Sequence, residues 1–277
     1  ADLSLDDNCF YDVLPEYFLY RYLNAKNEVT KHVLETFDRP ENYQHMMNLV
    51  QMLSDIESRD LNIDIEPIKH LLSSVKGRNF HQRLRSTRWV CDYNAWGTVT
   101  GRLSTKPKSF PILTMGKEFR GCIKPNNDWL LELDFNAAEL RVLLALSEQD
   151  QPQNDIHDWN VQNVFNVRNK FWDGFKIKTD YGRIMDDVDE HHALNYIVQS
   201  TTIDMVHEQA YKVFKLLEGM KSNVAFLIHD AVYIDLANDE RQAVVKMLDT
   251  FKKTRYGNFK VNVSAGRNLG EMKGLKL

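Results

Sequence analysis

The stretch that most constrains the fold is Trp-Leu-Leu-Glu-Leu-Asp-Phe-Asn-Ala-Ala-Glu-Leu-Arg-Val-Leu-Leu-Ala-Leu at residues 129–146. Up to Asp134 it is apolar apart from Glu132, which predicts a buried strand that ends near Asp134. The following residues, 137–146, place leucines at helical spacing and predict an amphipathic helix. A strand that delivers a carboxylate just before a helix is a common way to hold a divalent metal ion, but one carboxylate is not a metal site.

A second candidate carboxylate, Asp230, lies far along the chain. Two β-rich apolar runs, 224–228 and 231–236, flank the pair His229-Asp230, and this pattern is typical of a tight hairpin. If the two strands are neighbours, Asp134 and Asp230 lie side by side. Two carboxylates that share two Mg²⁺ ions can stabilise both oxygens of an in-line phosphoryl displacement, and Mg²⁺ needs few carboxylates beside substrate phosphates. For either aspartate alone, a strand-end or turn role is the commoner explanation.

Charge is distributed unevenly along the chain. Residues 76–124 hold eleven lysines and arginines and two acidic residues, although the whole chain has a net charge of −4. A segregated basic stretch of this kind is typical of a surface that faces phosphates. A solvated charged face is the alternative.

Composition places the chain among ordinary globular proteins. It has 277 residues, of which 43% are hydrophobic and 27% charged. No apolar run approaches the roughly 18 residues of a membrane helix, and the opening residues 1–7 do not resemble a signal peptide. The three cysteines are scattered without metal-ligand spacing, which favours a reducing compartment. The expected location is the cytoplasm, with no membrane partner.

Five motifs, in order, resemble those of family A DNA polymerases, the type of bacterial DNA polymerase I and phage replicases. Asp-Phe-Asn-Ala-Ala-Glu-Leu-Arg at 134–141 is similar to motif A, and Ile-His-Asp at 228–230 is similar to motif C. Thr-Gly-Arg-Leu-Ser at 100–104 matches a palm motif that precedes motif A. The segments 195–204 and 266–268 resemble two further motifs near the end of the family's palm.

The resemblance implies roles for residues of motifs A and C. Asp134 and Asp230 correspond to the aspartates that hold two Mg²⁺ ions, and the backbone carbonyl of Phe135 corresponds to a further ligand. Glu139 matches the side chain that stands where a ribose 2′-hydroxyl would intrude, which favours deoxynucleotides. The glutamate that usually follows the motif C aspartate is replaced by Ala231.

Other positions imply contacts with primer–template DNA. Arg102 matches an arginine that in the family lies in the minor groove of the DNA near the primer end. All correctly matched base pairs present hydrogen-bond acceptors in this groove, so the arginine can check base pairing without reading the sequence. Asn195 and Gln199 share one face of a predicted helix, and in the family this face meets template or primer. His229 corresponds to a contact with the primer end.

Three more residues are candidate phosphate contacts. Lys106 and Lys108 lie in a basic loop that prolines make rigid, which suits contact with the DNA backbone. His157 corresponds to a histidine that contacts the incoming phosphates of a dNTP, and a structural role for it is equally open.

The fingers and thumb of such a polymerase are abbreviated. The family's fingers carry Arg-x-x-x-Lys-x-x-x-x-x-x-Tyr-Gly on a helix, but residues 166–178 offer thirteen positions, and Arg168 and Lys170 are too close together for that motif. The segment 65–85 is too short for the long helical pair of a thumb. Either these parts are deleted, or the sequence joins pieces that longer loops separate. The second explanation is favoured because it accounts for both gaps.

The N-terminal part resembles a degraded exonuclease. Residues 22–30 are similar to the last motif of the proofreading domain, but Lys26 stands where the family has a metal-binding aspartate, so no 3′→5′ exonuclease activity is expected. An ordinary amphipathic helix is the alternative. With the short insertions, this feature favours a phage-type enzyme that works in the host cytoplasm.

The expected fold class is α+β, with an antiparallel palm sheet backed by helices. Residues 1–44 are expected to form a helical exonuclease remnant, 45–88 a truncated thumb base and 89–277 the palm, with a residual fingers junction at 166–178. Together these features predict a template-directed DNA polymerase that joins dNMP to a primer 3′-hydroxyl. Its partners are primer–template DNA and dNTPs, and no motif identifies a processivity or replisome protein.

Two other functions remain open. The chain is alternatively a catalytically silent palm that grips primer–template DNA. A single-subunit RNA polymerase shares the palm, but Glu139 disfavours it because such a side chain would obstruct a ribose.

Overall fold

The computed structural model describes residues 15–150 and 165–276. Contacts divide the chain into two compact units, Ala1–Pro40 and Glu41–Leu277. The described part of the first unit contains α1 (Glu16–Thr36), a helix that buries none of its side chains. Among the described residues, no helix combines the length and the apolar character that crossing a membrane requires.

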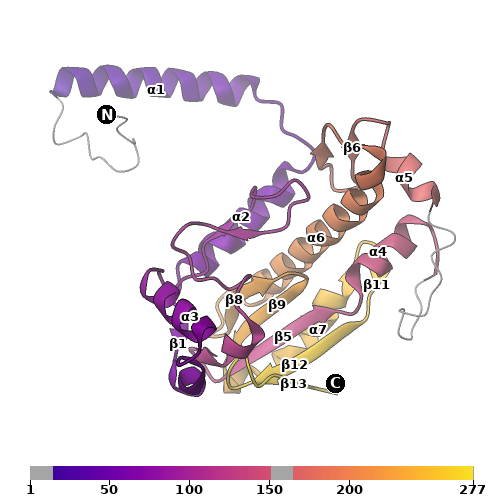
Figure 1. The fold of residues 1–277 in the computed structure, drawn as a ribbon. Helices are drawn as coiled ribbons and strands as arrows, with labels where there is room; N and C mark the ends of the chain where they lie inside the picture. The colour runs from indigo at the N-terminus through magenta and orange to yellow at the C-terminus, as the bar shows by residue number, and fades with distance from the viewer. Residues whose placement is uncertain (1–14, 151–164, 277) are drawn as a thin grey trace. The chain divides into compact units, whose positions relative to one another are not determined.

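The second unit is built on a five-stranded antiparallel sheet with the order β13-β12-β5-β9-β8 (Figure 1). The sheet consists of β5 (Trp129–Phe135), β8 (Asn223–Ile228), β9 (Ala231–Leu236), β12 (Val261–Gly266) and β13 (Lys273–Gly274). The predicted strand and the predicted hairpin are confirmed as β5 and as β8–β9. The fold class, α+β with an antiparallel sheet, agrees with the expectation.

Strand β5 has two chemically different faces because successive side chains point to opposite sides of a strand. Leu131, Leu133 and Phe135 are buried, and the ring of Phe135 stacks on Phe251 with centroids 4.3 Å apart. Glu132 and Asp134 alternate with them and are only partly buried. One face of β5 therefore packs into the core, and the other bears the buried Leu130 followed by the polar Glu132 and Asp134.

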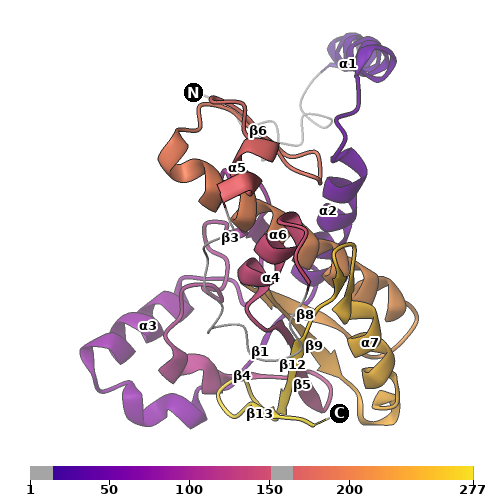
Figure 2. The same cartoon turned by 90° about the vertical axis from the view of Figure 1, so that its right-hand side faces the viewer.

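Several helices of the second unit contact strands of this sheet. The described helices are α2 (Tyr43–Glu57), α3 (Val75–Arg85), α4 (Ala138–Leu146), α5 (Phe165–Phe171), α6 (Glu190–Leu216) and α7 (Ala243–Lys252), with short 3-10 turns η2 (Glu66–Leu71), η3 (Lys117–Cys122) and η4 (Asn238–Glu240). Helices α2, α6 and α7 make the contacts with the sheet. The long helix α6 lies beside α2, α4 and α7 and contacts β8 (Figures 1 and 2). It begins where the Asp189 carboxylate accepts the backbone N–H of His192.

Four short antiparallel ladders connect the loops. They pair β1 (Asn62–Ile63) with β4 (Ile123–Lys124), β2 (Tyr93–Asn94) with β3 (Ser104–Thr105), β6 (Ile177–Lys178) with β7 (Ile184–Met185), and β10 (Lys253–Thr254) with β11 (Gly257–Asn258).

Two expected elements are shorter than the sequence indicates. The sequence of residues 88–100 predicts a strand that ends at Gly101, but only Tyr93 and Asn94 join a ladder, because the Asn94 side chain accepts the Trp96 backbone N–H and turns the chain. The sequence of residues 237–256 predicts one helix, but the structure divides it into η4 and α7 and ends α7 at Lys252. The carboxylate of Glu240 accepts the backbone N–H groups of Lys221 and Ser222 and so ties η4 to the segment before β8.

Residues 45–88 and 89–277 both belong to the second compact unit. Helix α2 joins this unit through α6, where the Tyr211 hydroxyl donates to Gln51 Oε1 at 2.9 Å. The functional division between a thumb base and a palm stays a prediction.

Candidate active site

Asp134 and Asp230 meet at one end of the sheet. Asp134 is the second-last residue of β5, opposite Ala231 of β9 and Asn262 of β12. Asp230 directly precedes Ala231 and forms, with His229, the two-residue turn between β8 and β9. The two carboxylates are therefore diagonal neighbours across the β5–β9 pair, as the hairpin pattern predicts.

The backbone on both sides of this end has a left-handed turn residue. His229 has φ of 53°, which suits the first position of a two-residue hairpin turn. Ala137 has φ of 51° and reverses the chain between β5 and α4. The turn is further held by the guanidinium of Arg141, whose Nε donates to the Asn136 carbonyl at 2.7 Å. The segment that carries Asp134 is thus fixed on both sides.

Burial and nearby negative charge raise the pKa of Asp134. Burial first and the charge of Asp230 second raise the pKa of its carboxyl to about 7; the Asn262 amide opposes this shift, and the charge of Glu132 adds a smaller increase. Among residues 15–150 and 165–276, neither Asp134 nor Asp230 forms an ion pair with a lysine, arginine or histidine. Adjacent carboxylates without a cationic side chain fit a divalent cation, which would neutralise both.

A pocket of about 570 Å³ opens beside Asp230. It is lined by Arg102, Ala137, Ala138, Glu139, Leu140, Gln199, Thr202, Ile203, His229 and Asp230. The structure thus brings five predicted site residues to one cavity: Arg102, Glu139, Gln199, His229 and Asp230.

Polar contacts connect three of these residues across the pocket. Arg102 Nη2 lies 2.7 Å from Glu139 Oε1. In the orientation that satisfies both neighbours, the Gln199 amide accepts from Arg102 at 3.0 Å and donates to Thr100 Oγ1 at 2.6 Å. Arg102 and Glu139 are each about half exposed, so this network lies at the pocket mouth and remains accessible to a ligand.

Other predicted residues lie outside the pocket. Lys106 Nζ is 2.7 Å from Asp92 Oδ1, and this hydrogen bond raises the pKa of Lys106. Lys108 is exposed at φ of 64°, and Asn195 is exposed one turn before Gln199 on α6. His157 falls outside the described residues.

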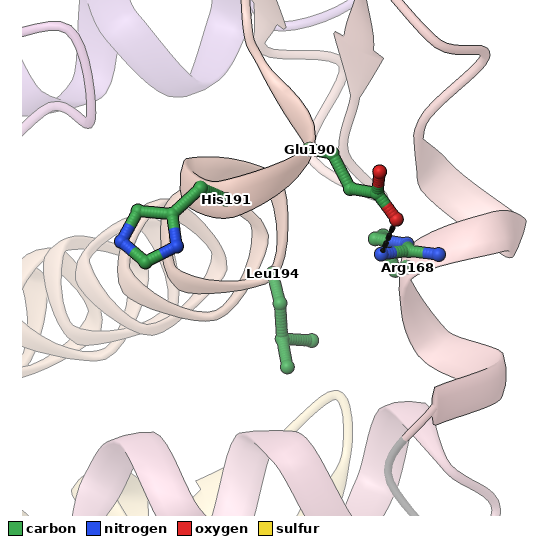
Figure 3. A pocket seen from close by; sticks show the side chains of 4 residues that line it. All are labelled: Arg168, Glu190, His191 and Leu194. Carbon is green, nitrogen blue, oxygen red and sulfur yellow. Dashed lines mark hydrogen bonds and ion pairs between the residues drawn. The ribbon is translucent and has the colours of Figure 1, made fainter.

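A separate pocket of about 470 Å³ lies between α5 and the start of α6 and is lined by Arg168, Glu190, His191 and Leu194 (Figure 3). Of these residues, Arg168 lies in 166–178, which the sequence predicts to be a residual fingers junction. Arg168 Nη1 lies 2.6 Å from Glu190 Oε1, as the dashed line in Figure 3 shows. Lys170 Nζ lies 3.3 Å from Glu148. Both cations of α5 are therefore engaged by carboxylates.

Sequence reasoning missed two contributors to the site. Asn262 lies opposite Asp134, with its amide nitrogen 3.5 Å from the carboxylate. Thr100 belongs to the Thr-Gly-Arg-Leu-Ser motif, and its side chain also orients Gln199, which the motif alone does not indicate. No local pattern marks Asn262, because its importance comes from the pairing of β12 with β5.

Comparison with protein-family models and with curated proteins finds no match. Among solved structures, the chain is similar to the POL domain of Pol1 from M. smegmatis in complex with DNA primer-template and dNTP. The TM-score is 0.57 and the sequence identity 15%, over 73% of this chain and 53% of that chain. The chain thus spans about half the length of that neighbour, and the likeness shows a polymerase-like fold.

Proposed function

We propose that this chain is a template-directed DNA polymerase of the family A type, which joins dNMP to a primer 3′-hydroxyl with two Mg²⁺ ions. The observation that carries the proposal is the meeting of Asp134 and Asp230 beside a pocket that Arg102, Glu139 and Gln199 also line. The polymerase-like fold supports it. The primer-template DNA and dNTP bound by the similar structure indicate the ligands to test here.

Each residue has a proposed task. Asp134, Asp230 and the backbone carbonyl of Phe135 would hold the metal ions, which when bound supply charge stabilisation for the attacking and leaving oxygens. Glu139, at the start of α4, stands beside the sugar of the incoming nucleotide and excludes a 2′-hydroxyl. His157 contacts the incoming phosphates.

The DNA-facing residues position the primer end. Arg102 and Gln199 are held together and reach base edges in the minor groove. His229, exposed in the turn beside Asp230, contacts the last primer nucleotide. Asn195, Lys106 and Lys108 bind the backbone further along the duplex, where phosphate contacts position the DNA without reading its sequence.

The test is primer extension with Mg²⁺ and all four dNTPs. Asp230→Ala is expected to lower the rate by about two orders of magnitude or more, because one carboxylate of the metal pair is lost. Asp186→Ala is the matched control, since this exposed aspartate pairs with Lys176 away from the pocket. Equal extension by the parent and Asp230→Ala would remove Asp230 from the site.

One observation favours a second candidate, a silent palm that binds primer–template DNA without extending it. The cations of α5, Arg168 and Lys170, are both paired with carboxylates and so are poorly placed to receive a triphosphate. Fluorescein-labelled primer–template that binds the parent but is never extended would establish this candidate. Preferential incorporation of rNTPs would instead indicate an RNA polymerase.

A further inference from the structure

The Thr-Gly-Arg turn at residues 100–102 rests on a side chain from a distant segment. Gly101 is buried and has φ of 81°. A Cβ built on Gly101 would lie 2.3 Å from Nη2 and 2.5 Å from Cζ of Arg183. The guanidinium of Arg183 therefore lies directly against the Gly101 backbone, and only glycine leaves room for it.

Arg183 is itself fixed at both ends. Its backbone closes the turn between β6 and β7, where Thr179 N donates to Arg183 O at 3.0 Å. Its guanidinium donates to both carboxylate oxygens of Asp204, from Nε at 2.9 Å and from Nη2 at 2.6 Å. A bidentate pair of this kind sets the plane of the guanidinium as well as its position.

The Arg183–Asp204 pair is deeply buried, with side chains 11% and 1% exposed. Burial alone would raise the pKa of Asp204, but hydrogen bonds from Arg183 and His45 outweigh it and lower that pKa. His45, Asp204 and His207 also offer metal-ligand atoms within 4.8 Å of one another. Because Arg183 already occupies both Asp204 oxygens, the guanidinium rather than a metal ion neutralises this carboxylate.

The same helix supports the turn at a second point. Asp204 and Gln199 both lie on α6, and Gln199 bonds to Thr100 and Arg102, the residues on either side of Gly101. The turn is thus held from α6 by Gln199 directly and by Asp204 through Arg183. These contacts fix the point from which the Arg102 side chain enters the pocket.

We propose that Arg183 is a positioning residue for Arg102. Its guanidinium, locked by Asp204, supports Gly101 and sets where Arg102 meets primer–template DNA. This role rests on the proposed function, in which Arg102 contacts the primer end. It also links the segment after the residual fingers junction to the DNA-facing turn.

The experiment measures the dissociation constant of fluorescein-labelled primer–template by anisotropy, together with extension kinetics. Arg183→Lys keeps the positive charge beside Asp204 but removes the planar support under Gly101. We expect binding to weaken about fivefold or more, while KM for dNTP is unchanged. Arg255→Lys is the matched control. The guanidinium carbon of Arg255 lies 3.6 Å from the ring centroid of Tyr181 in the same turn, but Arg255 does not support Gly101.

A double-mutant cycle separates positioning from simple loss of stability. If Arg183 acts through Arg102, adding Arg183→Lys to Arg102→Ala produces little further weakening. If Arg183→Lys weakens DNA binding by the same factor in the parent and in the Arg102→Ala variant, the proposal is overturned. If Arg183→Lys does not fold, the pair Arg183→Met with Asp204→Leu removes the guanidinium without leaving a buried charge unpaired.

A readout independent of DNA keeps the two proposals distinguishable. If the parent neither binds nor extends primer–template, the proposed polymerase function fails. Hydrogen exchange of residues 98–104 then tests Arg183 alone. Faster hydrogen exchange of these residues in Arg183→Lys than in Arg255→Lys would show that Arg183 stabilises the backbone at Gly101. Equal exchange in the two variants would overturn that role.

Discussion

At the scale of single residues, the Asp134 carboxyl differs in its acidity from a free aspartate side chain. Its raised pKa of about 7 reflects burial first and the charge of Asp230 second. A proton would therefore compete with the proposed metal ion for this carboxylate near neutral pH. Removing the proton becomes easier as pH rises, so metal binding strengthens in the same direction.

This competition predicts a pH-dependent magnesium requirement. Below about pH 7 the half-saturating Mg²⁺ concentration for primer extension should rise about tenfold for each pH unit, because Asp134 must lose one proton before it binds the metal. Above about pH 8 the requirement should level off. Magnesium titrations at several pH values measure it, and a half-saturating concentration independent of pH would contradict the assignment of Asp134.

Substitution of Glu139, which forms an ion pair with Arg102, should change the selectivity between ribonucleotides and deoxynucleotides. Glu139→Ala should raise incorporation of rNTPs relative to dNTPs by about tenfold or more, because it removes the carboxylate that we propose excludes a 2′-hydroxyl. The ratio of kcat/KM for the two sugars measures it. Glu148→Ala, on an exposed residue beyond α4, is the control. An unchanged ratio would show that Glu139 serves only to hold Arg102.

Sequence reasoning reached the residues that interrupt an apolar pattern and missed those that act through distant contacts. Asp134 and Asp230 were predicted because each is polar at the end of a β-rich run. Asn262 and Arg183 were not, because their partners lie on elements that sequence periodicity cannot pair. Their roles depend on tertiary geometry alone.

At the scale of elements, α3 contains a glycine that helix propensity does not explain. Gly77 lies in the first turn of α3, and the Ser74 side chain caps its backbone N–H at 3.0 Å. A Cβ there would lie 2.0 Å from the carbonyl oxygen of Leu71. The backbone that precedes α3 therefore approaches the helix too closely for any side chain.

Gly77→Ala is accordingly expected to destabilise the protein by about 2 kcal/mol or more. Alanine gains up to about 1 kcal/mol of helix propensity, but the clash with the backbone of Leu71 costs more. Urea unfolding followed by circular dichroism measures the difference. Asn79→Ala, at an exposed position of the same helix, should be neutral or slightly stabilising. Equal stabilities of the two variants would disprove the close approach.

The elements were predicted unequally well from sequence. Strand β5, the β8–β9 hairpin and the helices α2, α4 and α6 follow from apolar runs and helical spacing, which are local signals. The strand predicted over residues 88–100 is wrong for most of its length. Side-chain hydrogen bonds, such as the one that Asn94 accepts, form turns where β propensity indicates a strand.

At the scale of the whole molecule, the boundary after Pro40 predicts an independent second unit. Helix α1 buries no side chain, so residues 41–277 should fold alone, with a thermal midpoint within about 2 °C of the parent. Calorimetry and primer extension of this fragment test it. A fragment that aggregates or loses extension would show that residues 1–40 complete the fold or the site.

The antiparallel sheet was predictable as a class, because its strands alternate or run apolar between turn signals. Its order was not, since β12 lies beside β5 although the two are far apart in sequence. The fingers and thumb assignments stay predictions. Residues 166–178 are too few to contain the fingers motif of the family, and residues 45–88 are too few to contain the long helical pair of its thumb.

The position of β5 between β9 and β12 has a consequence for protein synthesis. Asp134 leaves the ribosome long before residues 231–236 and 261–266, which supply both neighbours of its strand. Until then β5 has no partner on either side, and such non-local pairing is slow to form. A nascent chain therefore carries no assembled pair of carboxylates until residues 261–266 have been synthesised and paired with β5.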